Sequence, residues 1–175
     1  MSTVSVADAT SSEWWTNIGD EANLVLTDPP HLDRFDSAPA HYIFTSSWYP
    51  HALRVVHLGG TLLHSCGVEP EELANYLRVR VPRQVLVWTY PELESHRYWL
   101  LHTQLDVTLP TVWNCSKPDP LYRLLLLRLA SSGCLVADPF CGRGEIPSAA
   151  RELGLGWVGC DLDEESVRAC WEQGL

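Results

Sequence analysis

Short apolar runs alternate with amphipathic or polar segments along almost the whole chain. The apolar runs predict seven strands, at residues 3–7, 24–27, 61–66, 84–88, 105–113, 134–137 and 156–160. The intervening segments predict helices at residues 11–15, 48–57, 69–77, 92–102, 120–131, 145–153 and 163–173. This alternation favours an α/β domain with a largely parallel sheet. No repeat or low-complexity linker interrupts the pattern, so residues 1–175 are predicted to form one domain.

The composition is that of a globular protein, with 46% hydrophobic and 19% charged residues. No apolar run approaches the ~20 residues that a membrane span needs. The first eight residues lack a basic stretch followed by an apolar one, so no secretion signal is expected and the cytoplasm is the expected location. An arginine-rich chain with a single lysine suits a virus or mobile element with a GC-rich genome, and the location would then be the host cytoplasm.

Charge and cysteine content narrow the function classes. The net charge of −10 weighs against a simple nucleic-acid binder, which usually carries a basic face. The densest basic stretch, Arg78, Arg80 and Arg83, is either a solvated strand or turn edge or a patch that contacts phosphate. None of the six cysteines forms a C-x-x-C pair, so neither a metal site nor a disulfide framework is expected.

A glycine loop follows the strand predicted at 134–137. Asp138-Pro139-Phe140-Cys141-Gly142-Arg143-Gly144 lies between that strand and a helix, where ligands bind in open α/β sheets. Glycine lets the backbone approach a ligand, and a helix N-terminus offers free N–H groups. The next strand ends at Asp161, where an acid can accept hydrogen bonds from ribose hydroxyls. The pattern indicates a nucleoside cofactor, or else a tight turn in which the two acids only cap helices.

A rigid turn follows the strand predicted at 24–27, in the segment Asp28-Pro29-Pro30-His31. Two prolines cannot continue a strand, and they fix the backbone direction. The Asp28 carboxylate and the Pro29 carbonyl then offer two acceptors, which suits the two N–H donors of an amino group, and His31 adds a ring that can stack on a base. The alternative is a Pro-Pro turn that ends a strand, with Asp28 as a local cap.

These two motifs together resemble the amino-methyltransferases that use S-adenosylmethionine to methylate adenine N6 or cytosine N4 in DNA. Their catalytic motif is D/N/S-P-P-Y/F/W and their cofactor motif is close to D-P-F-x-G-x-G. Because the catalytic motif comes first here, the chain is similar to the permuted β class. Three further segments resemble family motifs: Ala7-Asp8-Ala9 resembles G-D-A, residues 58–62 resemble L-K-P-G-G-x-L with His57-Leu58 in place of Lys-Pro, and Lys117-Pro118 resembles K-P-x-x-L.

The resemblance implies a Rossmann-like methyltransferase fold, with a seven-stranded, mostly parallel sheet that has one antiparallel strand. It implies an enzyme whose cofactor is S-adenosyl-L-methionine and whose partner is DNA. The implied catalytic residues are Asp28, Pro29, Pro30 and His31. The implied cofactor-binding residues are Asp8, Ala9, Asp28, Lys117, Asp138, Pro139, Phe140, Cys141, Gly142, Gly144, Asp161 and Leu162.

The mechanism expected from the resemblance is direct attack of a base amino group, held by Asp28 and the Pro29 carbonyl, on the cofactor's methyl group. Asp28 favours adenine N6 over cytosine N4. Residues 32–47, after the turn, are expected to be either a mobile loop that closes over the base or an ordinary surface loop.

The chain departs from the family pattern in three ways. His31 replaces the aromatic residue, Glu145-Ile146-Pro147 follows the glycine loop in place of T-T, and little room remains for a target-recognition domain. The last departure predicts weak sequence specificity, a single-stranded target, or a homodimer or second subunit. The alternatives are a catalytically silent subunit that binds nucleic acid, an N4-cytosine enzyme, and an enzyme acting on RNA, a free nucleotide or a protein amide.

Overall fold

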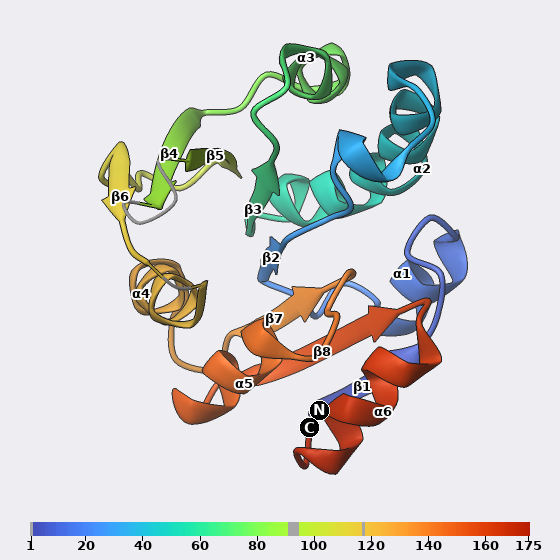
Figure 1. Cartoon of the computed structure of the whole chain (residues 1–175). Coiled ribbons are helices and arrows are strands. Elements are labelled where there is room, and N and C mark those ends of the chain that lie inside the picture. Colours follow the sequence, from blue (N-terminus) through green and yellow to red (C-terminus); the bar gives the residue numbers. More distant parts are fainter. Residues whose placement is uncertain (1, 91–94, 117) are drawn as a thin grey trace.

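A single twisted sheet runs through the molecule, and every strand that carries a predicted motif belongs to it (Figure 1). The computed structural model describes residues 2–90, 95–116 and 118–175, with the backbone alone at position 119. The strands are β1 (Ser2–Val6), β2 (Leu24–Thr27), β3 (Thr61–Cys66), β4 (Gln84–Tyr90), β5 (Ser95–Thr103), β6 (Val112–Asn114), β7 (Leu135–Asp138) and β8 (Gly156–Asp161). The helices are α1 (Ser12–Ile18), α2 (Ala38–His57), α3 (Pro70–Val79), α4 (Pro118–Leu129), α5 (Glu145–Glu152) and α6 (Glu164–Glu172), with a short 3-10 helix at Leu32–Arg34.

The strand order is β1-β8-β7-β2-β3-β5-β4-β6. Strand β5 pairs antiparallel with both of its neighbours, β3 and β4, and all the other pairs are parallel. The predicted mostly parallel sheet with one antiparallel strand is therefore confirmed. Because seven strands point the same way, their carboxyl ends lie along one edge of the sheet, and β5 begins at that edge.

Two predicted elements between β4 and α4 were wrong in type or extent. The described part of the chain contains eight strands rather than seven, because residues 95–103 form β5 instead of the predicted helix at 92–102, whose first three residues lie outside the described part. Backbone pairing with β3 on one side and β4 on the other overrides the local helical pattern. The strand predicted at 105–113 is reduced to β6, and Pro110 explains part of the loss because it lacks the N–H that a ladder needs.

Helix α2 begins ten residues before the predicted start at position 48. Ser37 caps it by accepting a hydrogen bond from the backbone N–H of Ala40, and Pro39 lies in the first turn, where a missing N–H costs nothing. Residues 32–47 are therefore a 3-10 turn and the first half of a helix, and neither form of the predicted loop is correct. His41 and Thr45 on this half-helix are buried.

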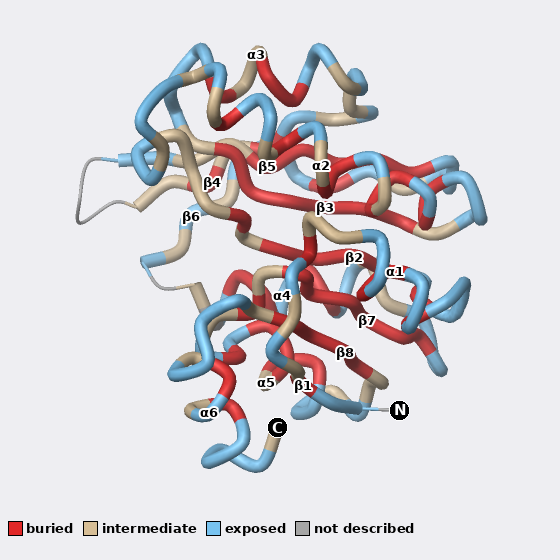
Figure 2. The backbone as a smooth tube through the Cα atoms, turned by 90° about the vertical axis from the view of Figure 1, so that its right-hand side faces the viewer, coloured by how far each residue is buried: buried red, intermediate tan, exposed pale blue. Residues whose placement is uncertain are grey.

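Two apolar clusters cover the two faces of the sheet, so the central strands β2, β3 and β7 are buried (Figure 2). One cluster contains side chains from α1, α2 and α3, including Trp48, Tyr49 and Tyr76. The other contains side chains from α4, α5 and α6, including Tyr122 and Ile146. Within the described residues, no helix is long and apolar enough to cross a membrane.

We predict that Gly60→Ala destabilises the protein by about 2 to 3 kcal/mol. A Cβ at position 60 would lie 2.5 Å from the Asn23 carbonyl oxygen and 2.6 Å from Val55 Cγ1, where β3 begins beside β2. The matched control is Gly59→Ala, because its Cβ would meet nothing within 4 Å and only its φ of +91° opposes alanine. That strain costs about 1 kcal/mol. Urea unfolding measures both variants, and equal losses would contradict the steric argument.

Candidate functional site

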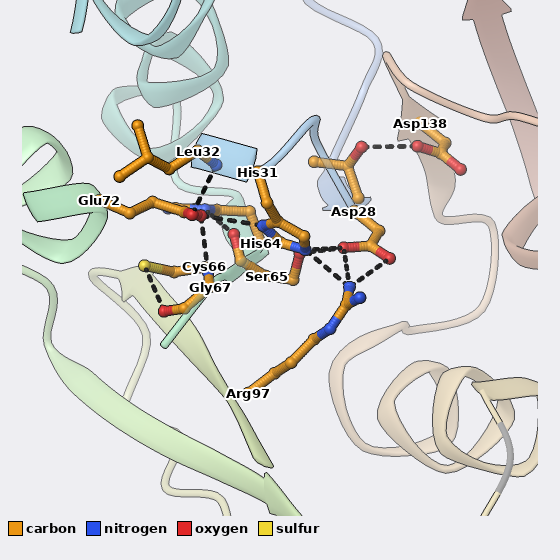
Figure 3. Close-up of polar contacts among 11 residues, drawn as sticks. Asp28, His31, Leu32, His64, Ser65, Cys66, Gly67, Glu72, Arg97 and Asp138 are labelled. Carbon is orange, nitrogen blue, oxygen red and sulfur yellow. Dashed lines mark hydrogen bonds and ion pairs between the residues drawn. The ribbon is translucent and has the colours of Figure 1, made fainter. Parts of the chain in front are cut away.

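Adjacent strands bring the two sequence motifs together. Strands β2 and β7 pair in parallel, with Leu24 opposite Val136 and Val25 opposite Ala137. Both motifs therefore leave the sheet at the same edge, although they lie more than a hundred residues apart in sequence. At that edge, Thr27 Oγ1 donates a hydrogen bond of 2.6 Å to Asp138 Oδ1 (Figure 3).

A cavity of about 270 Å³ opens between the two motifs. Its wall contains Asp28 from the predicted catalytic turn and the start of the predicted cofactor loop. The lining residues are Asp28, Tyr122, Asp138, Phe140, Cys141, Gly142, Arg143, Glu145 and Ile146. A ligand in this cavity would therefore touch both motifs.

The glycine loop has the backbone conformation that its sequence predicts. Gly142 has a φ of +50° and Gly144 a φ of +86°, a region that other residues rarely adopt. A Cβ at position 144 would also lie 2.5 Å from Leu175 Cδ1. The N–H of Gly142 donates to Asp161 Oδ2 at 2.8 Å, so the loop is tied to the end of β8. The predicted ribose-binding acid thus also shapes the loop.

Asp138 is only 2% exposed at the base of this loop. Burial raises the pKa of its carboxyl to about 7, against the opposing hydrogen bonds from Thr27 and the backbone N–H of Phe140. A carboxyl with this pKa is partly protonated near pH 7, and a positive group in the cavity would favour its ionised form.

The rest of the loop packs into the fold. The Phe140 ring lies 5.5 Å from the Phe44 ring and 5.1 Å from the Trp48 ring, on the side of α2. The Pro139 carbonyl accepts a hydrogen bond from the Cys160 thiol at 3.3 Å, and Cys141 is 5% exposed. These residues hold the loop against the sheet.

Asp8, Ala9 and Leu162 lie beyond the ends of the neighbouring strands β1 and β8. Asp8 accepts two hydrogen bonds from Thr10, and the Ala9 carbonyl accepts one from the Trp15 indole at 2.8 Å. Leu162 is 68% exposed. The structure thus places them along the same sheet edge as the glycine loop. Lys117 lies outside the described residues.

Three side chains contact the Asp28 carboxylate (Figure 3). Ser65 donates its hydroxyl hydrogen to Oδ1, His31 Nε2 lies 3.2 Å from Oδ1, and Arg97 Nη1 lies 3.3 Å from each oxygen. Burial would raise the pKa of Asp28, but His31, Arg97 and Ser65 together lower it. Asp28 is therefore ionised and acts as an acceptor. Its pair with Arg97 is partly exposed and contributes at most about 1 kcal/mol.

Both ring nitrogens of His31 have partners. Nδ1 lies 2.9 Å from Glu72 Oε1, and Nε2 faces Asp28 and, at 2.6 Å, Arg97 Nη1. Burial alone would lower the pKa of His31, but its contacts with the two carboxylates raise the pKa to about 9. In the protonated ring, Nε2–H donates to Asp28. In the neutral ring, Nε2 accepts from Arg97, so a proton and Arg97 compete for this nitrogen.

The Glu72 carboxylate holds the end of the Asp28–His31 turn in place. Its side chain is 1% exposed, and it accepts hydrogen bonds from the backbone N–H groups of Leu32, at 2.8 Å, and Gly67, at 2.6 Å. Burial would raise the pKa of Glu72, but His31 and these two N–H groups lower it. A Cβ at position 67 would overlap the carboxylate, so glycine permits this approach.

Sequence reasoning did not assign Ser65, Glu72 or Arg97 to the site. Ser65 lies inside a predicted strand, Glu72 fits the acidic start of α3, and Arg97 falls in the segment predicted to be a helix. A strand prediction for residues 95–103 would have brought Arg97 to the sheet edge. Nothing in the sequence connects Glu72 with His31, which lies 41 positions away.

We predict that stability falls as the pH rises from about 6.5 to 9. The pKa of folded His31, about 9, exceeds its ordinary value of 6.5. Its contribution is therefore complete below pH 6.5 and is lost as the pH passes 9, a change of up to about 3 kcal/mol. Urea unfolding at several pH values measures this. The difference between the protein and a His31→Gln variant should shrink across this window, and a constant difference would contradict the proposed linkage.

We predict that Glu72→Gln costs about 2 to 4 kcal/mol of stability, because the amide leaves a buried N–H unpaired and removes the charge that faces His31. The control is Glu71→Gln, on the exposed side of the same helical turn, which should change stability by less than about 0.5 kcal/mol. Thermal or urea unfolding distinguishes them. Similar small losses in both variants would show that Glu72 does not fix the turn.

Comparison with known proteins identifies the family. The sequence model of a family described as DNA methylase, N6_N4_Mtase, matches residues 71–172, more than half of the chain. No curated protein matches.

Solved structures share the fold. M1.HpyAVI is 15% identical, with a TM-score of 0.74 over 99% of this chain and 98% of its own. TTHA0409 from Thermus thermophilus, described as a putative DNA modification methylase, is 19% identical, with a TM-score of 0.72 over 99% and 94%. The cytosine-N4-specific PvuII DNA methyltransferase is 15% identical, with a TM-score of 0.76 over 99% and 88%. The adjacent motifs, the sheet and the family match agree: this chain belongs to the N6_N4_Mtase family of DNA methylases.

Proposed function

We propose that this chain transfers a methyl group from S-adenosyl-L-methionine to the exocyclic amino group of a base in DNA, with adenine N6 as the first candidate. One observation carries the proposal: Asp28 and Asp138, from the two motifs, line one cavity at the carboxyl edge of the sheet. The motif order supports assignment to the permuted β class.

The residues around the cavity fit the cofactor. The left-handed glycines let the backbone come close to the cofactor. Asp138 would supply negative charge for its sulfonium, and Asp28 would supply a hydrogen-bond acceptor for the amino group of the base. Asp161, Asp8, Ala9 and Leu162 lie along the edge where a nucleoside would extend. M1.HpyAVI and TTHA0409 have both been crystallised with S-adenosyl-L-methionine. When bound, this cofactor supplies an electrophilic methyl group.

The chain's own residues hold and orient the amine. The Asp28 carboxylate and the Pro29 carbonyl each accept one amino hydrogen, which directs the nitrogen lone pair toward the cavity. Within the described part of the chain, no donor contacts the Pro29 carbonyl, and Pro30 has no N–H to compete for it. Holding the reactants in an attacking geometry can lower the barrier by ~7–11 kcal/mol. The base must leave its stack to reach this turn.

Adenine and cytosine both carry a suitable amino group. Asp28, in the position where the family's N4-cytosine members usually have serine, favours adenine. The PvuII enzyme is named as cytosine-specific, so cytosine N4 is the alternative acceptor. RNA remains a further alternative, and the single-strand preference and the homodimer or second subunit remain proposals.

A second candidate function is a catalytically silent subunit that binds nucleic acid. The observation that favours it is the occupied Asp28 carboxylate, which already receives Ser65, His31 and Arg97. Calorimetry with S-adenosyl-L-methionine tests this candidate, because a silent subunit that no longer binds the cofactor would give no heat of binding.

The test is to incubate the protein with labelled S-adenosyl-L-methionine and single- or double-stranded DNA, then digest the DNA to nucleosides. We expect N6-methyladenine. Asp28→Ala should lower kcat by ~10³-fold or more because the amine loses its acceptor, while cofactor binding changes little. Asp33→Ala, on the exposed 3-10 turn, is the matched control and should keep full activity. No methylated base on any DNA would refute the enzyme assignment, and activity in Asp28→Ala would refute the catalytic role.

A further inference from the structure

We infer that Arg97 is a specificity-determining residue. In the free protein, Arg97 contacts the Asp28 carboxylate, which is the proposed acceptor for the target amine. When the target strand binds, Arg97 exchanges this carboxylate for a phosphate of the strand. The inference rests on the proposed function and deepens it. It assigns to one side chain the discrimination between a base within a strand and a free nucleoside.

The first argument is position. A single nitrogen of Arg97, Nη1, lies 3.3 Å from both oxygens of Asp28. This nitrogen is planar and carries two hydrogens, as the amino group of adenine or cytosine does. The same nitrogen lies 2.6 Å from His31 Nε2. Arg97 therefore contacts the Asp28 carboxylate, which is one of the two acceptors that the proposed mechanism gives to the target amine (Figure 3).

The second argument is mobility relative to the other donors. Ser65 is fully buried, and His31, with 15% of its side chain exposed, is held by the buried Glu72. The Arg97 side chain is 36% exposed and reaches Asp28 from the first residues of β5. Partly exposed ion pairs are weak because water screens them. Arg97 is the donor that can leave without exposing a buried polar group.

The third argument is charge. The chain carries a net charge of −10, so binding a polyanion requires local cations. Arg83 and Arg54 are paired away from the site, with Asp106 and Asp20, whereas Arg97 and Arg143 lie at it. A guanidinium binds phosphate through two parallel hydrogen bonds, so a phosphate at the rim replaces what Arg97 loses at Asp28. A free nucleoside brings no such replacement.

The experiment compares Arg97→Met with the unaltered protein on two kinds of substrate. One is free deoxyadenosine or deoxycytidine, and the other is a single-stranded oligonucleotide of 12 nucleotides that contains all four bases. With the nucleosides, the variant should raise kcat/KM roughly fivefold, because Asp28 is uncovered. With the oligonucleotide, the variant should lower kcat/KM roughly tenfold, mainly through KM, because the phosphate contact is lost. Arg54→Met, at an exposed ion pair with Asp20 outside the site, is the matched control and should change neither value.

Opposite signs on the two substrates support the inference, because a purely structural defect would lower both values together. A parallel loss, or no change on either substrate, overturns it. Fluorescence anisotropy of the same oligonucleotide, with every linkage either natural or converted to an uncharged methylphosphonate, gives a readout without turnover. Neutralisation should weaken binding severalfold more in the unaltered protein than in Arg97→Met. Equal weakening in both overturns the role of Arg97, whereas methyl transfer to no substrate by any of the three proteins refutes only the proposed function.

Discussion

The parallel pairing of β2 with β7 is the contact on which the candidate site depends. Each strand contributes four residues, and all eight are buried, so the register is set by apolar packing on both faces of the sheet. A shift of one residue would turn each buried side chain to the opposite face. With this register, β2 and β7 end at the same edge of the sheet, and Asp28 and Asp138 line one cavity there.

The charges at the site are balanced as a group rather than in isolated pairs. Two carboxylates, Asp28 and Glu72, flank one imidazole, and Arg97 contacts both Asp28 and the ring. The departure at His31 from the family's aromatic residue is therefore not an isolated change. The buried Glu72 gives the polar ring a partner that a buried imidazole needs. Glu72 also accepts hydrogen bonds from the backbone N–H groups of Leu32 and Gly67, so one carboxylate contacts His31 and ties the turn to the end of β3.

Much of the fold follows from local pattern. Apolar strands such as residues 24–27 and 61–66 were predicted with their observed bounds, since buried parallel strands have a strong signal of their own. Strand β5 was missed because its identity depends on pairing with β3 and β4, which no local window contains. The early start of α2 was missed, although a serine at the N-cap (Ser37) and a proline in the first turn (Pro39) are typical of a helix start.

The candidate site likewise contains residues that the sequence predicts and residues that it does not. The motif residues were found because each motif is contiguous and its turn chemistry is local. Ser65, Glu72 and Arg97 come from three separate elements, β3, α3 and β5, and only the tertiary fold relates them to Asp28 and His31. A sequence window therefore identifies the motifs that line the cavity and misses the side chains that set the charge of Asp28 and His31.

The absence of a side chain at Gly67 has an evolutionary consequence. A Cβ there would take the space of the Glu72 carboxylate, and Glu72 is the partner of His31 Nδ1. A substitution at position 67 would therefore displace the Glu72 carboxylate from His31, so glycine is required there while His31 is retained. In relatives of this chain, a histidine after the two prolines should be inherited together with a glycine after β3 and an acid in the first turn of α3.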